Sequence, residues 1–253
     1  THGDHEIIAL APASVQECMD LTIEAFNLAE RYRNPVVVMT DGEVGHMRES
    51  IVLPDPDRLT RSERPTPSVS PGEFTPFRAS RGKIPEMPRF GTGYHTYVTG
   101  LTHDERGLPA TDDAGTHTEL VERLCRKISD EVEELTRVEQ DMQDGARVGI
   151  ISYGISSRSS AGAVRLLRAE GMKVSHLRLV TVYPFPEHVI RDFCEPLRRV
   201  VVPEMNLGQV CHNVRVALVG IAVVEKVNKI GGEIITPQEI VDAVLSTGEA
   251  VRV

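Results

Sequence analysis

The sequence predicts an α/β protein, because strand-like and helical patterns alternate along most of its length. From Arg147 onward, four strand patterns are each followed by a helical pattern. Near the beginning, an amphipathic helical pattern leads into the β-branched run at residues 35–40 (PVVVMT). Strands that alternate with helices pair in parallel, so parallel sheets are expected in both regions.

The first region, residues 1–55, has the pattern of a β–α–β unit. A helix is expected over about 14–32, with Ser14 and Glu17 as its capping box, and Asn34-Pro35 ends it. One helix and two strands do not complete an open sheet. This region is therefore expected to be the C-terminal part of a ligand-binding domain whose other strands lie upstream of Thr1.

The second region, residues 56–145, is expected to be a connector followed by a long helix. Prolines and glycines interrupt every periodic pattern in the connector, which also holds most of the aromatic residues. These aromatic side chains either pack on the surface of the protein or contact a partner subunit, and both interpretations stay open. Thr116 and Glu119 are expected to begin a helix of about twenty-five residues as a second capping box.

The third region, residues 146–253, is expected to form a doubly wound parallel sheet. The expected strands are 147–153, 173–182, 199–202 and 222–227, and the expected helices are about 159–170, 186–195, 208–219 and 236–246.

Composition excludes several classes of function. A net charge of −9 without a concentrated basic face argues against nucleic-acid binding. No apolar stretch approaches the ~20 residues of a membrane-spanning helix, so no membrane association is expected. The four cysteines are scattered without a C-x-x-C pair. That spacing favours reduced thiols in the cytoplasm and excludes an iron–sulfur cluster held by this chain alone.

Four polar residues follow the strand expected at residues 35–40: Asp41, Glu43, His46 and Arg48. The carboxyl end of a parallel strand is where open α/β sheets bind ligands, so these residues are candidates for a site. The histidine is expected to position a ligand by hydrogen bonding, with proton transfer as the alternative. The arginine is expected either to bind a substrate carboxylate or to form a surface ion pair with a neighbouring glutamate.

A second polar cluster, formed by His2, Asp4 and His5, lies at the beginning of the chain. Consecutive residues on a turn rarely converge on one metal ion, so a locally hydrogen-bonded turn is favoured over a metal site. A turn that faces an active site built with another chain is also open. With His46, the two histidines form the basis of a separate hypothesis, a metal-dependent hydrolase.

Two turns in the third region can hold a ligand or simply begin a helix. The first is residues 154–160 (GISSRSS), where exposed amides can hold an anion, although helix capping by Ser159 is favoured. The second is residues 203–209 (PEMNLGQ), where a ligand and a subunit contact explain the pattern equally well.

Several stretches, in order along nearly the whole chain, resemble the α subunits of 2-oxoacid:ferredoxin oxidoreductases. They are THGDHEIIALAPASVQECMDLTIEAFNLAERYRNPVVV, VGHMRES, FGTGYHTYVTGLTHDERG, SYGISSRS, LRLVTVYPFP, VVPEMNLGQ and NKIGGEIITPQEI. The THGDHE start favours the branch of the family that acts on 2-oxoglutarate. Relatives commonly carry an acidic residue directly after the aspartate, where this chain has Gly42, so Glu43 is the acid here.

This resemblance implies the C-terminal part of a thiamin-enzyme pyrimidine-binding domain, ending near residue 55. It also implies a transketolase C-terminal-like domain over residues 146–253. Thiamin diphosphate would lie between the α and β subunits, with Mg²⁺ and a [4Fe–4S] cluster in the β subunit. Candidate cofactor-binding residues are then His2, Asp4, His5, Asp41 and Glu43, and candidate catalytic residues are His46 and Arg48.

The implied activity is coenzyme A-dependent oxidative decarboxylation of a 2-oxoacid, from 2-oxoglutarate to succinyl-CoA, with electrons passing to ferredoxin. The implied partners are the β subunit, with or without a γ subunit, and ferredoxin, and the piece alone is expected to be inactive. The alternative is a non-catalytic assembly or binding module of such a complex. The family's substrate threonine, pyrimidine glutamate and substrate arginine are expected upstream of Thr1.

Overall fold

The computed structural model describes residues 4–79, 83–96 and 98–246. The chain forms two compact units, each built from separate stretches. The first unit contains Thr1–Ile8, Ile23–Val37 and Leu53–Leu135, and the second unit contains Ala9–Thr22, Val38–Val52 and Thr136–Val253. The α/β class predicted from the sequence is confirmed.

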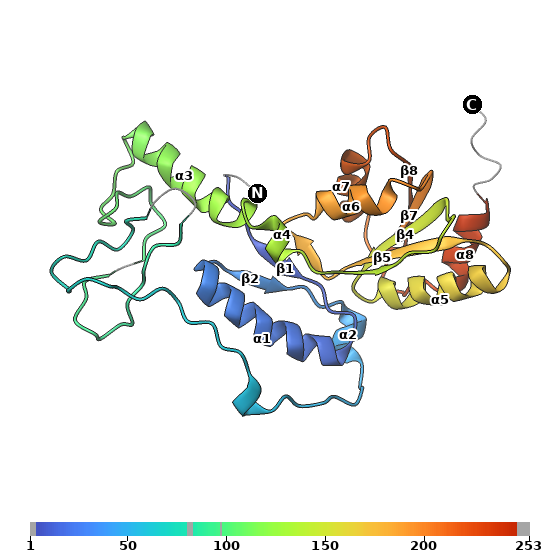
Figure 1. The fold of residues 1–253 in the computed structure, drawn as a ribbon, viewed down its shortest axis with the longest axis horizontal. Helices are drawn as coiled ribbons and strands as arrows, with labels where there is room; N and C mark the ends of the chain where they lie inside the picture. The colour runs from blue at the N-terminus through green and yellow to red at the C-terminus, as the bar shows by residue number, and fades with distance from the viewer. Residues whose placement is uncertain (1–3, 80–82, 97, 247–253) are drawn as a thin grey trace. The chain divides into compact units, whose positions relative to one another are not determined.

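A five-stranded sheet with the strand order β3-β5-β4-β7-β8 forms the centre of the second unit (Figure 1). Four of its strands are parallel, as predicted, and β3 pairs antiparallel with β5 at one edge. The strands are β3 (Val138–Asp141), β4 (Val148–Tyr153), β5 (Val174–Leu179), β7 (Arg199–Glu204) and β8 (Val223–Asn228).

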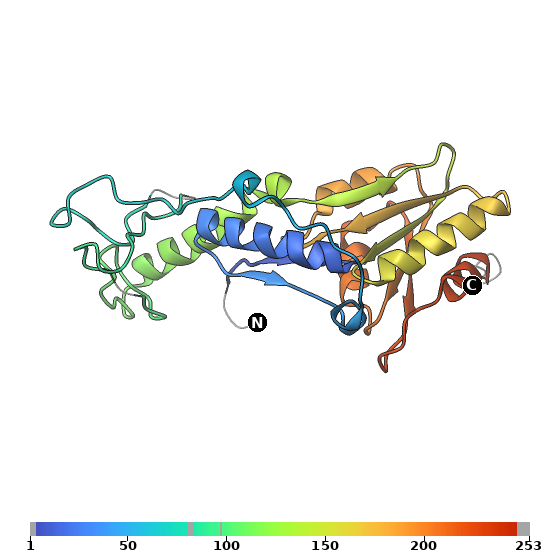
Figure 2. The same ribbon diagram turned by 90° about the horizontal axis from the view of Figure 1, so that it is seen from below.

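Helices cover both faces of this sheet (Figure 1 and Figure 2). On one face, α6 (Glu187–Cys194) and α7 (Gln209–Ala217) pack on the cluster that contains Ile151 and Val200. On the other face, α5 (Ser156–Ala169) and α8 (Pro237–Ser246) pack on the cluster that contains Ile150 and Val201. Neighbouring strand residues therefore serve opposite cores, which explains the continuous apolar run at residues 200–202 (VVV) of β7.

A second, three-stranded sheet has the order β2-β1-β6, with β1 at Ile8–Leu10, β2 at Val36–Val38 and β6 at Thr181–Tyr183. The single strand predicted over residues 173–182 is wrong, because the chain leaves β5 after Leu179. Strand β6 then pairs antiparallel with β1, with Leu10 opposite Thr181. One neighbour of β1 therefore comes from downstream in the chain. The expectation that further strands of this domain lie upstream of Thr1 stays a prediction.

Helix α1 (Val15–Tyr32) confirms the helix predicted over about 14–32. Its first turn contains the predicted capping contact, since the Glu17 amide donates to the Ser14 hydroxyl at 3.2 Å. The Glu17 carboxylate accepts from the amide of Ala13, at 2.8 Å, so the box is shifted by one residue.

The connector is mostly irregular, as predicted, apart from the 3₁₀ turn Pro56–Arg58 and an isolated bridge between His103 and Pro109. It leads into α3 (Ala114–Ser129) and the short helix α4 (Val132–Leu135). The predicted capping box and the helix length of about twenty-five residues are both wrong. Asp113 caps α3, because its carboxylate accepts from the Gly115 amide at 2.9 Å.

Val138 and Met142 follow the helical spacing of α3, but residues 138–141 form strand β3 instead. Val138 pairs with Leu179 across the edge of the large sheet. Tertiary pairing with β5 therefore decides the conformation of a segment whose pattern alone favours a helix.

Candidate functional site

The turn predicted to bind a ligand begins at Asp41 and continues through the short helix α2 (Gly42–His46), which Val44 anchors by its burial. Asp41 does not cap α2. Its Oδ2 accepts a hydrogen bond of 2.6 Å from the Ile155 amide, directly before α5 in the second unit. Burial raises the pKa of Asp41, although the Ile155 amide opposes that rise. The carboxylate is therefore engaged by the protein itself.

Gly154 makes this contact possible. Its φ of +54° is a left-handed conformation, and a Cβ atom at this position would lie 2.2 Å from Asp41 Oδ2. The predicted capping of the helix by Ser159 is wrong, since α5 begins at Ser156 and Ser159 is buried within it. Asp41 instead places a negative group at the N-terminus of this helix, where the exposed amides and the helix dipole favour it.

The other polar side chains of the turn are not engaged by the described part of the chain. His46 and Arg48 are exposed, and neither makes a hydrogen bond or an ion pair with any described residue. Glu43 is half-buried. The surface ion pair considered for Arg48 is not formed with Glu49, whose carboxylate instead accepts from Arg158 at 2.6 Å and from the Val15 amide at 3.0 Å. The turn thus presents an imidazole and a guanidinium to solvent.

The candidates at the beginning of the chain lie in the first unit. Asp4 and His5 are exposed, and His2 is outside the described residues. Within the part of the chain that the structure describes, no group of three or more His, Cys, Asp or Glu side chains is arranged to hold a metal ion. In the same part, no helix is both long and apolar enough to cross a bilayer.

Pattern analysis missed a buried ion-pair cluster in the second unit. The Arg178 side chain on β5 is 9% exposed, and its Nη1 donates to Glu17 at 2.8 Å and to Glu139 at 3.1 Å. Nη2 also donates to Glu17. Burial alone would raise the pKa of Glu17, but the hydrogen bonds and charge of Arg178, with the Ala13 amide, hold it below its ordinary value. The sequence pattern predicted Glu17 only as a helix-capping residue and gave no signal of its ion pair with Arg178.

A cavity of about 410 Å³ lies beside this cluster, and its wall includes Ser157, Arg158 and His176. Burial lowers the pKa of His176 to about 4, so the imidazole is neutral at physiological pH. Its Nε2 lies 2.7 Å from the Ser152 hydroxyl. Because Ser152 is completely buried, this pair is an internal hydrogen bond, and a substrate cannot reach the hydroxyl.

The turn at residues 203–209 is closed by its own hydrogen bonds. Glu204 is fully buried and accepts from the amides of Val210 at 2.9 Å and Cys211 at 2.7 Å, and from the Tyr153 hydroxyl at 3.0 Å. Asn206 donates to the same hydroxyl at 2.8 Å. This arrangement satisfies the first amides of α7, so the fold explains the polar residues of this turn.

Comparisons with known proteins identify the family. The 2-oxoglutarate synthase subunit KorA of Methanothermobacter marburgensis is 49% identical over 245 residues, which are 97% of this chain and 65% of that protein. The corresponding subunit of Methanocaldococcus jannaschii is 45% identical over 247 residues, again 97% of this chain and 65% of the relative. Residues 2–123 match the family described as pyruvate flavodoxin/ferredoxin oxidoreductase, thiamine diphosphate-binding, and residues 146–240 match pyruvate:ferredoxin oxidoreductase core domain II. The chain belongs to the 2-oxoacid:ferredoxin oxidoreductase family.

The resemblance stated from the sequence is thereby confirmed.

A solved member of the oxidoreductase family has the same fold. The 2-oxoglutarate:ferredoxin oxidoreductase of Magnetococcus marinus, determined with 2-oxoglutarate, coenzyme A and succinyl-CoA bound, matches with a TM-score of 0.83 at 28% identity. The match covers 97% of this chain and 43% of that one. This chain therefore spans about 65% of the length of its curated oxidoreductase relatives and less than half of the solved structure.

The Asp41 contact predicts a specific cost for Gly154→Ala. The positive φ alone should cost about 1–2 kcal/mol in the free energy of unfolding. The clash with Asp41 Oδ2 should add to it. Gly171→Ala is the matched control, since Gly171 has a φ of +82° and no atom near the added Cβ. Urea denaturation should show a larger loss of unfolding free energy for Gly154→Ala than for Gly171→Ala. In the double variant with Asp41→Ala, part of the loss caused by Gly154→Ala should be recovered, because the clashing carboxylate is absent. Equal losses in the two single variants would contradict this contact.

The buried Arg178 cluster predicts an acid-dependent contribution to stability. Removing the guanidinium in Arg178→Met should cost about 3–5 kcal/mol at neutral pH, because Glu17 is left without its partner. Folding lowers the pKa of Glu17 below 4.5, its ordinary value in the unfolded chain. The ion pair therefore contributes its full stabilisation at pH values above 4.5. That stabilisation is lost as the pH falls through the folded-state pKa. The difference in the free energy of unfolding between Arg178→Met and the native chain should therefore become smaller below pH 4.5, and urea denaturation at a series of pH values measures it. Arg158→Met, which breaks the more exposed pair with Glu49, should lower the free energy of unfolding by much less than Arg178→Met does.

Proposed function

We propose that this chain is part of the α subunit of a 2-oxoglutarate:ferredoxin oxidoreductase, which converts 2-oxoglutarate, coenzyme A and oxidised ferredoxin into succinyl-CoA, CO₂ and reduced ferredoxin. The observation that carries this proposal is the gradation of identity among its relatives. Methanogen subunits named 2-oxoglutarate synthase reach 49% identity over 97% of this chain. The ketoisovalerate oxidoreductase subunit VorB of Methanothermobacter thermautotrophicus reaches 35%, the same value as the 2-oxoglutarate synthase subunit of Archaeoglobus fulgidus. The Magnetococcus marinus enzyme, which has 2-oxoglutarate and succinyl-CoA bound, supports the same substrate.

The proposed cofactor is thiamin diphosphate, shared with a β subunit that holds Mg²⁺ and a [4Fe–4S] cluster. The thiamine diphosphate-binding family covers residues 2–123 and includes the turn from Asp41 to Arg48. Asp41 is held by the Ile155 amide, so it would fix the turn without binding the cofactor itself. Glu43 and His46 fit the polar wall of such a site, because no described residue engages them. When bound, thiamin diphosphate supplies the nucleophilic carbon and the electron sink for decarboxylation.

Arg48 is the residue we assign to the substrate. 2-Oxoglutarate carries two carboxylates, and a free guanidinium can bind one of them through two parallel hydrogen bonds. His46, two residues earlier and also exposed, would orient the bound acid by donating a hydrogen bond. His46 is the last residue of a short helix that is anchored by the buried Val44, and Arg48 follows that helix. The protein's part in the reaction is thus to orient the substrate and to exclude alternatives.

The test uses the complete α subunit assembled with its β subunit. The complex should reduce ferredoxin only when 2-oxoglutarate and coenzyme A are both present, and more efficiently than with 2-oxoisovalerate. Arg48→Gln should lower kcat/KM for 2-oxoglutarate by about 30- to 150-fold, as expected when a charge-assisted pair worth about 2–3 kcal/mol is lost.

Arg165→Gln is the matched control, because Arg165 is also an exposed arginine of the second unit and lies on α5. It should leave kcat/KM unchanged. A complex that prefers 2-oxoisovalerate would refute the assigned substrate. A fully active Arg48→Gln complex would refute only the role of Arg48.

A further inference from the structure

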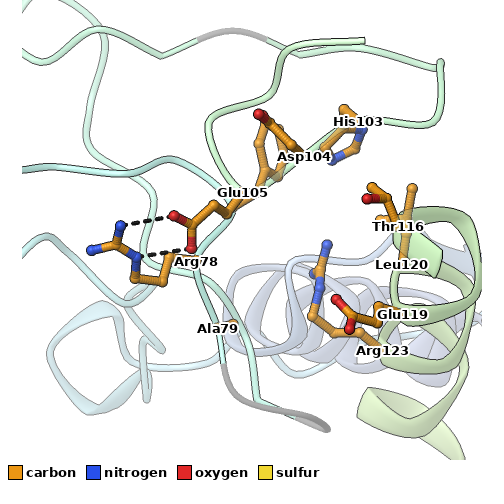
Figure 3. A pocket seen from close by; sticks show the side chains of 10 residues that line it. Arg78, Ala79, His103, Asp104, Glu105, Thr116, Glu119, Leu120 and Arg123 are labelled. Carbon is orange, nitrogen blue, oxygen red and sulfur yellow. Dashed lines mark hydrogen bonds and ion pairs between the residues drawn. The ribbon is translucent and has the colours of Figure 1, made fainter. Parts of the chain in front are cut away.

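A cavity of about 360 Å³ lies in the first unit, between α3 and the connector. Its size is within the ~300–1,000 Å³ that small-molecule sites occupy. Figure 3 shows the Arg123 guanidinium and the His103 imidazole pointing into the same space from opposite walls. The wall also contains Phe77 and Thr116. The proposed oxidoreductase function assigns no role to any of these residues.

Arg123 is a cation without a counterion in the described part of the chain. The side chain is half-buried on α3, and no described residue gives it a hydrogen bond or an ion pair. Two further cations belong to this region, Arg33 and Lys127, and the charge of Arg123 adds to burial in lowering the pKa of each. Burial, reinforced by Arg123 and Arg33, lowers the pKa of Lys127 to about 8. A desolvated positive cluster of this kind is unfavourable unless an anion binds to it.

His103 offers a buried hydrogen-bonding atom in the same cavity. The residue is 9% exposed, and its Nδ1 lies 2.8 Å from the Leu101 carbonyl oxygen. A carbonyl only accepts, so Nδ1 carries the proton and Nε2 of the neutral ring is an acceptor. That Nε2 is buried and has no partner among the described residues. The ring is fixed by Phe77, at a centroid distance of 4.2 Å, and Arg33 lies over the same phenyl ring at 5.1 Å.

The carboxylates on the wall do not neutralise Arg123. Glu105 accepts two hydrogen bonds from Arg78, at 3.0 and 2.8 Å, which Figure 3 shows as dashed lines. Asp104 is paired with Arg106, at 3.1 and 3.0 Å. Glu119 is exposed on α3, one turn before Arg123, and makes no ion pair with it. One guanidinium and one imidazole acceptor therefore remain for a ligand.

We propose that this cavity binds a small metabolite that carries one anionic group beside a hydrogen-bond donor, such as a hydroxy acid or a protonated phosphate. The carboxylate or phosphate accepts from Arg123, and the hydroxyl donates to His103 Nε2. The exposed carboxylate of Glu119 disfavours ligands with several negative charges. The donor Arg123 is thus matched by the anionic group of the ligand, and the acceptor His103 Nε2 is matched by the hydroxyl of the same ligand.

Isothermal titration calorimetry of the 253-residue chain tests the proposal with three probes. Glycolate and inorganic phosphate should bind, and acetate, which lacks the hydroxyl of glycolate, should bind about ten-fold more weakly. Arg123→Gln should weaken glycolate and phosphate at least ten-fold, by the loss of a charge-assisted pair. Arg126→Gln is the matched control on the same helix, since Arg126 is exposed and does not line the cavity. His103→Ala should reduce the affinity for glycolate to that for acetate.

A thermal unfolding measurement separates a binding role from a structural one. In buffer without these anions, Arg123→Gln should melt at or above the temperature of the native chain, because an uncompensated buried charge is removed. Phosphate should raise the melting temperature of the native chain only. A fall of more than about 5 °C in Arg123→Gln would show that Arg123 is structural and would overturn the proposal.

Two binding outcomes would also overturn it. One is a native chain that binds neither glycolate nor phosphate. The other is binding by the free chain that disappears in the assembled complex, which would assign Arg123 to a carboxylate of a partner subunit. Retained binding in the complex supports a small-molecule ligand, and it does so whether or not the complex oxidises 2-oxoglutarate.

Discussion

The hydrogen bond from the Ile155 amide to the Asp41 carboxylate is the contact on which the position of the turn from Asp41 to Arg48 depends. It fixes the turn after β2 at the N-terminus of α5, although the two residues are separated by 114 positions. Gly154 is needed at this point because any side chain there would occupy the position of the carboxylate. The turn that presents His46 and Arg48 is thereby held on a rigid helix, and a positioned site requires such support.

The charged groups of the protein fall into two classes that correspond to structure and function. Arg178 and Glu204 are buried and engaged by partners within the second unit, so they stabilise the fold. Arg48, His46 and Arg123 lack partners among the described residues. A half-buried charge without a partner, such as Arg123, is unfavourable for folding and therefore points to a ligand, whereas the exposed His46 and Arg48 are hydrated and available to one. The same criterion argues against a nucleophilic role for the Ser152–His176 pair, whose hydroxyl is buried and whose hydrogen bond is made internally.

Family membership and geometry contribute different parts of the functional argument. The relatives establish the family, and the proposal of 2-oxoglutarate as the substrate rests on them, while the structure shows which side chains have no partner among the described residues. Asp41 illustrates the difference. Its position after a strand and its likeness to the family made it a candidate for cofactor binding, but its hydrogen bond shows that it organises the turn. Glu43, His46 and Arg48 are the polar residues of that segment whose side chains no described residue engages.

Local patterns in the chain were enough to predict the α/β class, the position of α1, most of the helices and parallel strands after Arg147, and the irregular connector. These features depend on periodicity, capping residues and prolines, which act over a few residues. Long-range contacts set the strand conformation of Val138, the pairing of β6 with β1 and the environment at the start of α5. Each of these depends on a partner distant in the sequence, as in the pairing of Val138 with Leu179. The unpaired guanidinium of Arg123 and the engaged carboxylate of Asp41 could not be predicted for the same reason. Whether a charge is satisfied is a property of its neighbours in space, and it leaves no periodic pattern in the chain.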